Sequence, residues 1–158
     1  MDRQDMPWKK SLPWPNFSPP PQAGQIINLA NLRRRLLKLA DSVERNDQLR
    51  MEEAASELCD LLLNEERFAT IVPELDPRRI ADAIRRYVDG EHDAAAFAAI
   101  PERLEIAASR FESSRMHIAK VALAGVHSGY SQNATTLPGA VFAAFLRCLT
   151  RIATEFED

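Results

Sequence analysis

From Gln25 to the C-terminus, apolar residues recur every three or four positions, and this periodicity constrains the fold more than any other feature. Such spacing places apolar side chains on one face of an α-helix. The chain has only five glycines, and no β-branched run bounded by turns indicates a strand. We therefore expect an all-α fold, a bundle of five or six helices. The pattern predicts helices over residues 25–48, 51–66, 77–89, 93–99, 101–127 and 138–156.

Capping residues delimit two of these helices. Asp76 and Pro77 are typical of an N-cap and a first helical position, and Gly90 is placed to end that helix in a left-handed conformation. Thr136 is expected to cap the last helix, with Pro138 in its first turn. One apolar stripe predicts the buried face of the last helix: Val141, Phe145, Leu149, Ile152 and Phe156.

Two polar stretches interrupt the helical pattern in the second half of the chain. The helix over 101–127 is expected to break near Ser113 and Ser114, where two small polar residues interrupt the apolar face. Residues 128–136 are polar, and we expect them to form a loop before the last helix.

Residues 1–24 differ in composition from the rest of the chain, because they hold six of the ten prolines and both tryptophans. Proline fixes φ and removes a backbone donor, so this segment is predicted to be an extended arm, with residues 25–158 as a single helical domain. A proline frame presents aromatic rings with little entropy left to lose on binding. We predict that the arm docks in an apolar groove of this bundle or of a partner through Trp8, Pro13, Trp14, Pro15 and Phe17.

Composition excludes several classes of protein. No apolar run approaches the about 20 residues of a membrane-spanning helix, and no signal peptide is evident, so we expect a cytoplasmic protein with no membrane partner, while a secreted effector stays open. The formal net charge of −3 gives no global attraction to nucleic acid. The excess of arginine over lysine indicates a bacterial source.

Motifs of common enzymes are missing from the sequence. Paired Glu-x-x-His motifs and a glycine-rich phosphate loop are absent, so we expect no catalytic site, no cofactor and no metal. Cys59 and Cys148 lack metal-ligand spacing and are expected to pack as small apolar residues in a reducing compartment.

Arg110 and His117 lie seven positions apart on the expected 101–127 helix and therefore share a face. An arginine followed at this distance by a histidine resembles the motif of the HEPN-type helical ribonucleases. The resemblance covers these two residues, and Phe111 stands where the family usually has a polar residue. It implies that Arg110 and His117 act at a scissile phosphate.

A basic cluster on the first expected helix is a candidate for phosphate contacts, and it consists of Arg33, Arg34, Arg35 and Lys38. The alternative is a solvated face that pairs with the acidic segment 51–66. The sequence as a whole favours a non-enzymatic helical protein–protein interaction module, an adaptor or small subunit that uses its arm and a helical face, self-association included. The alternatives are a nucleic-acid-associated helical subunit with an arginine-rich surface and a HEPN-like ribonuclease.

Overall fold

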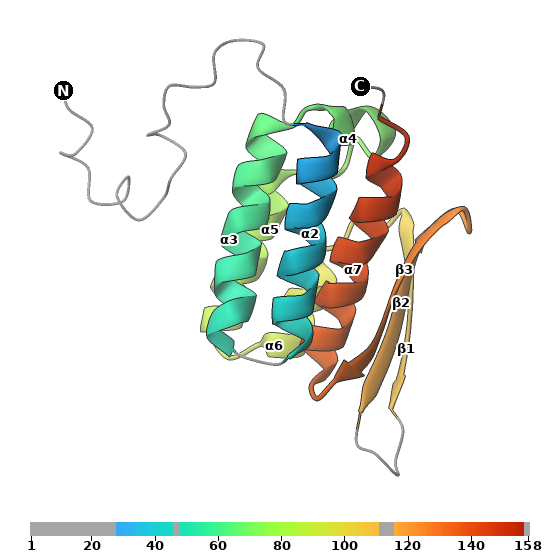
Figure 1. Cartoon of the computed structure of the whole chain (residues 1–158). Helices are drawn as coiled ribbons and strands as arrows, with labels where there is room; N and C mark the ends of the chain where they lie inside the picture. Colours follow the sequence, from blue (N-terminus) through green and yellow to red (C-terminus); the bar gives the residue numbers. More distant parts are fainter. Residues whose placement is uncertain (1–27, 46–47, 111–115, 157–158) are drawn as a thin grey trace, which may run out of the picture.

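The computed structural model describes residues 28–45, 48–110 and 116–156. Within these ranges the chain forms six α-helices and one three-stranded antiparallel sheet. The expected all-α bundle is therefore wrong. Figure 1 shows the helices gathered on one side of the sheet, with the last helix, α7 (Leu137–Ala153), running beside the strands.

Five helices precede the sheet: α2 (Leu29–Glu44), α3 (Gln48–Asn64), α4 (Arg67–Ile71), α5 (Pro77–Val88) and α6 (His92–Ala98). The helices predicted over 25–48, 51–66, 77–89, 93–99 and 138–156 are confirmed to within a few residues, as far as they fall in the described part of the chain. The short α4 was not predicted. None of the described helices is long and apolar enough to span a bilayer.

The predicted capping residues act as expected. The Asp76 carboxylate accepts a hydrogen bond from the backbone N–H of Arg78, and Pro77 is the first residue of α5. Gly90 follows that helix with φ +93°, and the Thr136 hydroxyl caps α7 by accepting from the N–H of Gly139. These local signals fixed helix ends because each satisfies backbone groups that the helix leaves unpaired.

The expected helix over 101–127 is instead a hairpin, and the expected loop over 128–136 is mostly a third strand. β1 (Leu104–Arg110) pairs antiparallel with β2 (His117–Leu123), which pairs antiparallel with β3 (His127–Ala134). The predicted break near Ser113 and Ser114 lies outside the described residues. The apolar and alanine positions of this region fit a period of two as well as a helical period, so packing against α7 decides between them.

α7 lies at the centre of the fold, between the sheet and the other helices. It packs against β2 and β3 on one side and against α2 and α6 on the other. Every residue from Pro138 to Leu146 is buried, as expected for a helix that is covered on all sides. The predicted buried stripe is confirmed, because all five of its residues are buried.

Gly129 allows β3 to approach the backbone of α7. A Cβ atom at this position would lie 2.3 Å from the carbonyl oxygen of Ala144 and 2.3 Å from the backbone nitrogen of Cys148. Because no side chain fits this gap, the strand and the helix are held closer together than larger residues would allow.

Candidate functional site

The two edges of the sheet differ, and this difference defines the candidate site. At the β3 edge, side chains from α2 and α7 take the place of a fourth strand. The Glu44 carboxylate accepts hydrogen bonds from the backbone N–H groups of Gln132 and Asn133, and Arg147 donates to the carbonyl oxygen of Tyr130 at 2.9 Å. Three backbone groups of β3 are therefore satisfied by side chains: the N–H of Gln132, the N–H of Asn133 and the carbonyl of Tyr130.

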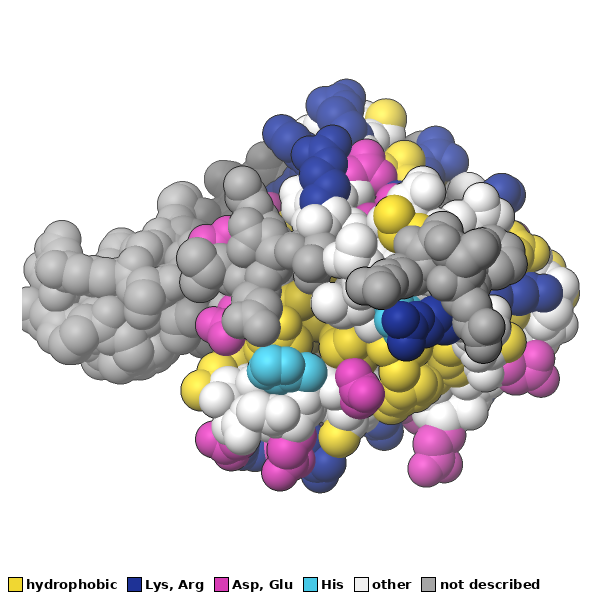
Figure 2. Space-filling view, turned by 90° about the horizontal axis from the view of Figure 1, so that it is seen from below, with side chains coloured by type: hydrophobic (Ala, Val, Ile, Leu, Met, Phe, Trp, Pro, Cys, Tyr) yellow, Lys and Arg dark blue, Asp and Glu magenta, His cyan; other side chains and the backbone are white. Residues whose placement is uncertain are grey.

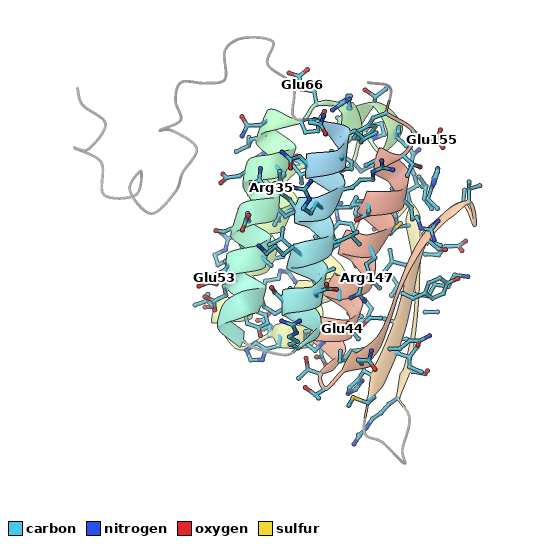
Figure 3. All side chains as sticks on the ribbon, in the orientation of Figure 1. Arg35, Glu44, Glu53, Glu66, Arg147 and Glu155 are labelled. Carbon is cyan, nitrogen blue, oxygen red and sulfur yellow. The ribbon has the colours of Figure 1, made fainter. Side chains whose placement is uncertain are left out.

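Glu44 and Arg147 form the centre of this seal. Two guanidinium nitrogens of Arg147 lie 2.9 Å from the two Glu44 oxygens, and one also lies 2.8 Å from Asp41. The Ser131 hydroxyl donates to Glu44 at 2.7 Å. Figure 3 shows Arg147 and Glu44 facing one another between α7 and α2.

The electrostatics of the pair follow from these contacts. The hydrogen bond from Arg147 lowers the pKa of Glu44 to about 2, against the opposing effect of burial, and the Ser131 hydroxyl adds to the lowering. The Glu44 hydrogen bond in turn raises the pKa of Arg147. Both groups are thus charged at neutral pH and clamp α2, β3 and α7 together.

At the opposite edge, the described part of the chain gives β1 no such protection. Among the described residues β2 is its only strand partner, and no described side chain bonds to the outer backbone groups of residues 105–110. Ile106 is half-buried, and the other residues of this stretch are exposed: Glu105, Ala107, Ala108, Ser109 and Arg110. A row of unpaired N–H and C=O groups is a template for another strand.

The side chains of β1 place few obstacles in the way of such a strand. Ala107, Ala108 and Ser109 are small, the described part of the strand contains no proline or lysine, and the irregularity in strand pairing lies between β2 and β3. Proline, lysine and bulges are devices that natural proteins use to block edge pairing, and the described part of β1 has none of these three. Its two charged residues, Glu105 and Arg110, lie toward the ends of the strand. The arrangement can therefore bind an extended peptide segment by backbone hydrogen bonds.

A second feature is a cleft of about 470 Å³ at the end of the helices where α7 begins. His92 from α6 and His117 from β2 line it, and the His92 ring stacks on Tyr87 with centroids 4.3 Å apart. Figure 2 views this end from below and shows hydrophobic side chains beside histidine and basic ones. In the described ranges no group of three ligating side chains could hold a metal ion.

Arg110 and His117 are brought together, although not as predicted. They are directly opposite in the pairing of β1 with β2. The helix that suggested the resemblance to HEPN-type ribonucleases is absent from these positions, so the helical context of that motif is wrong. The two residues are neighbours because of strand register, and their role in cleavage stays a prediction.

The predicted basic cluster is divided by its local contacts. Arg35 forms an ion pair with Glu57 of α3 at 3.5 Å, and Arg34 donates to the side chain of Asn31. Arg33 is half-buried, whereas Lys38 is exposed. At Arg35 the contact is the α2–α3 pairing that the alternative reading expected.

The predicted docking residues of the arm lie outside the described part of the chain: Trp8, Pro13, Trp14, Pro15 and Phe17. The two cysteines, by contrast, are free and buried as expected. Burial raises the pKa of the Cys59 thiol to about 11 and that of Cys148 to about 12. Neither thiol is a nucleophile at neutral pH, because the reactive form is the thiolate.

No protein-family model matches this chain, and neither a curated protein nor a solved structure matches it. Sequence reasoning missed the β1 edge because it placed this region in a helix. It also missed Glu44 and Arg147, which are 103 positions apart and give no local signal of their contact.

Proposed function

We propose that this protein is a non-enzymatic protein–protein interaction module, an adaptor or small subunit of a larger assembly. It binds a β-strand of a partner chain, another copy included, at the β1 edge. The observation that supports this function most strongly is the contrast between the two sheet edges. Glu44 bonds to backbone N–H groups of β3, whereas among the described residues no side chain or further strand bonds to the outer edge of β1.

The aromatic arm supplies a second contact in this proposal. Its tryptophans are anchors of the type that dominates binding energy at protein interfaces. Backbone pairing at β1 orients a partner strand but depends little on the partner's sequence. The arm adds specificity for the partner. We place the protein in the cytoplasm, where its two free cysteines stay reduced.

Site-specific photo-crosslinking in the native cells tests this function. A photoreactive phenylalanine derivative replaces Ala107 on the open edge, and a matched variant carries it at Gln132 on the sealed edge. Both positions are exposed, so the fold tolerates both. The expected result is a crosslinked product of defined mass from position 107 and none from position 132.

The same experiment contradicts the proposal if position 107 gives no product, or if both positions give the same products. Trp14→Ala in the position-107 variant tests the arm, and we expect a lower yield of the crosslinked product. An unchanged yield would remove the arm from the proposed function.

A further inference from the structure

We infer that β1 pairs with β1 of a second copy, antiparallel and across a two-fold axis at Ala107, to give a continuous six-stranded sheet. This inference rests on the proposed function and names the partner. In a two-fold contact the same strand must be complementary to itself. The residues of β1 meet this condition when Ala107 lies opposite Ala107 of the second copy.

With Ala107 opposite its own copy, Glu105 lies opposite Ser109 of the second chain. Ile106 lies opposite Ala108, and Leu104 opposite Arg110. No like charges are opposed, and the small side chains of Ala107, Ala108 and Ser109 let the two backbones approach. Opposed like charges are the usual penalty in such pairs, and this register avoids them.

The apolar surface on the helix side of β1 supports the same register. Leu104 is buried and Ile106 half-buried beneath the helical layer, while Ala108 on the same side of the strand is exposed. α7 covers β2 and β3 but has few contacts with β1. Pairing about Ala107 keeps both helical layers on one side of the sheet and joins Ile106 and Ala108 of both chains into one apolar strip.

The proline-rich part of the chain's own arm is a poor occupant of this edge. An added strand must offer N–H donors at alternate positions, and proline has none. Residues 13–21 contain five prolines, so that stretch cannot form a regular ladder. A second β1, which has no proline, can form one along its length.

The contact is small, and the expected affinity follows from its size. Seven residues on each side bury less than the about 1,200 Å² of a standard interface, so we expect a weak and reversible dimer. Light scattering after size exclusion, or sedimentation velocity, measures the molecular mass of the full chain from about 1 μM to about 500 μM. The expected result is a concentration-dependent shift from the monomer mass of 17.8 kDa to twice that value.

Ala108→Lys tests whether β1 forms this contact. The residue is exposed, so the variant keeps its fold, and circular dichroism checks this. Arg110 lies at the end of the paired strands, whereas a lysine at position 108 would place a charge at their centre, opposite Ile106, where it opposes pairing. We expect self-association to weaken about tenfold or more. The matched variant Gln132→Lys on the sealed edge should dimerise as wild type does. A dimer that persists in Ala108→Lys overturns the inference, as does a wild-type chain that stays monomeric throughout.

Cysteine crosslinking tests the register. Ala107→Cys places two thiols opposite one another, at the separation of directly opposed residues, about 5 Å between Cβ atoms. The native cysteines are buried, so wild type is a clean control, and Gln132→Cys is the control for the other edge. Mild oxidation or a short bismaleimide should give a covalent dimer only with Ala107→Cys. A dimer that fails to crosslink at position 107 overturns the two-fold register.

Failure of this inference differs from failure of the proposed function. A monomeric chain whose position 107 crosslinks to a different protein in cells rejects the second copy and keeps the interaction module. A chain that neither dimerises nor crosslinks rejects both.

Discussion

The contact between β3 and α7 depends on the missing side chain at Gly129. In Gly129→Ala the added methyl group would overlap the backbone of Ala144 and Cys148, and neither backbone can rotate away as a flexible side chain could. We expect a loss of more than about 3 kcal/mol in the free energy of unfolding, measured by urea denaturation. Ser128→Ala, at the neighbouring half-buried position, is the control and should change stability far less. A midpoint for Gly129→Ala close to wild type would show that β3 lies farther from α7.

Glu44 makes the stability of the protein dependent on acid. Its side chain is 13% exposed and that of Arg147 is 21% exposed, so water screens the pair only in part. The folded-state pKa of about 2 lies below the ordinary value of 4.5. The stabilisation is therefore complete above pH 4.5 and is lost as the pH falls toward 2, with a magnitude of about 2–3 kcal/mol.

Glu44→Gln isolates this contribution. The variant should be less stable than wild type at pH 7, and the difference in free energy of unfolding should shrink between pH 4.5 and pH 2.5. Glu102→Gln removes an exposed carboxylate and should show no such convergence. A difference between wild type and Glu44→Gln that stays constant with pH would contradict the assigned role.

The turn between β2 and β3 contains two successive left-handed residues, Ala124 with φ +54° and Gly125 with φ +72°. The N–H of Val126 closes the turn on the carbonyl of Leu123 at 3.0 Å. Alanine is strained in this conformation, and asparagine adopts it more readily. We expect Ala124→Asn to raise the free energy of unfolding by about 0.5 kcal/mol.

The matched variant is Gly125→Ala. A Cβ atom there meets no atom within 4 Å, so any loss of stability comes from the backbone conformation alone. We expect a loss of about 1 kcal/mol. Thermal or urea denaturation of both variants checks the pair, and opposite signs from those stated would place the turn in a different conformation.

The helices were predictable because each combines a buried stripe with local capping signals. The strands were not, and their residues explain why. β1 and β2 are rich in alanine, which fits a helical period as well as a strand period, and most of β1 is exposed, so apolar and polar residues do not alternate clearly. β3 is polar and contains Gly129, so it resembles a loop until α7 is placed against it.

The candidate site was even less accessible to prediction than the strands. An open sheet edge exists only once strand order is known, and nothing in the residues of β1 states which strand lies outermost. The Glu44–Arg147 seal depends on the placement of three elements. The sequence did predict that Arg110 and His117 lie near one another. They do so because they are opposite in the pairing of β1 with β2, not because they share a helix face.

The central position of α7 ties the sheet to the helices. Phe145 is fully buried in the core, within a helix that contacts both layers. Phe145→Ala should lower the free energy of unfolding by about 3–5 kcal/mol. Because both layers rest on this helix, hydrogen exchange should quicken together in β2 and α2, and unfolding should stay a single transition. Faster exchange in one layer alone would show two independent units.

The difference between the β1 and β3 edges also limits how many chains can join one sheet. A protein with two bare edges can add chains at both ends and elongate into a fibre. In the dimer that we propose, the composite sheet would end in β3 on either side, and in each β3 Glu44 and Arg147 bond to backbone groups of residues 130, 132 and 133. We therefore expect assembly through the β1 edges to stop at a pair. Removing the carboxylate of Glu44 would leave the N–H groups of Gln132 and Asn133 without this acceptor and so weaken the barrier to further growth at β3.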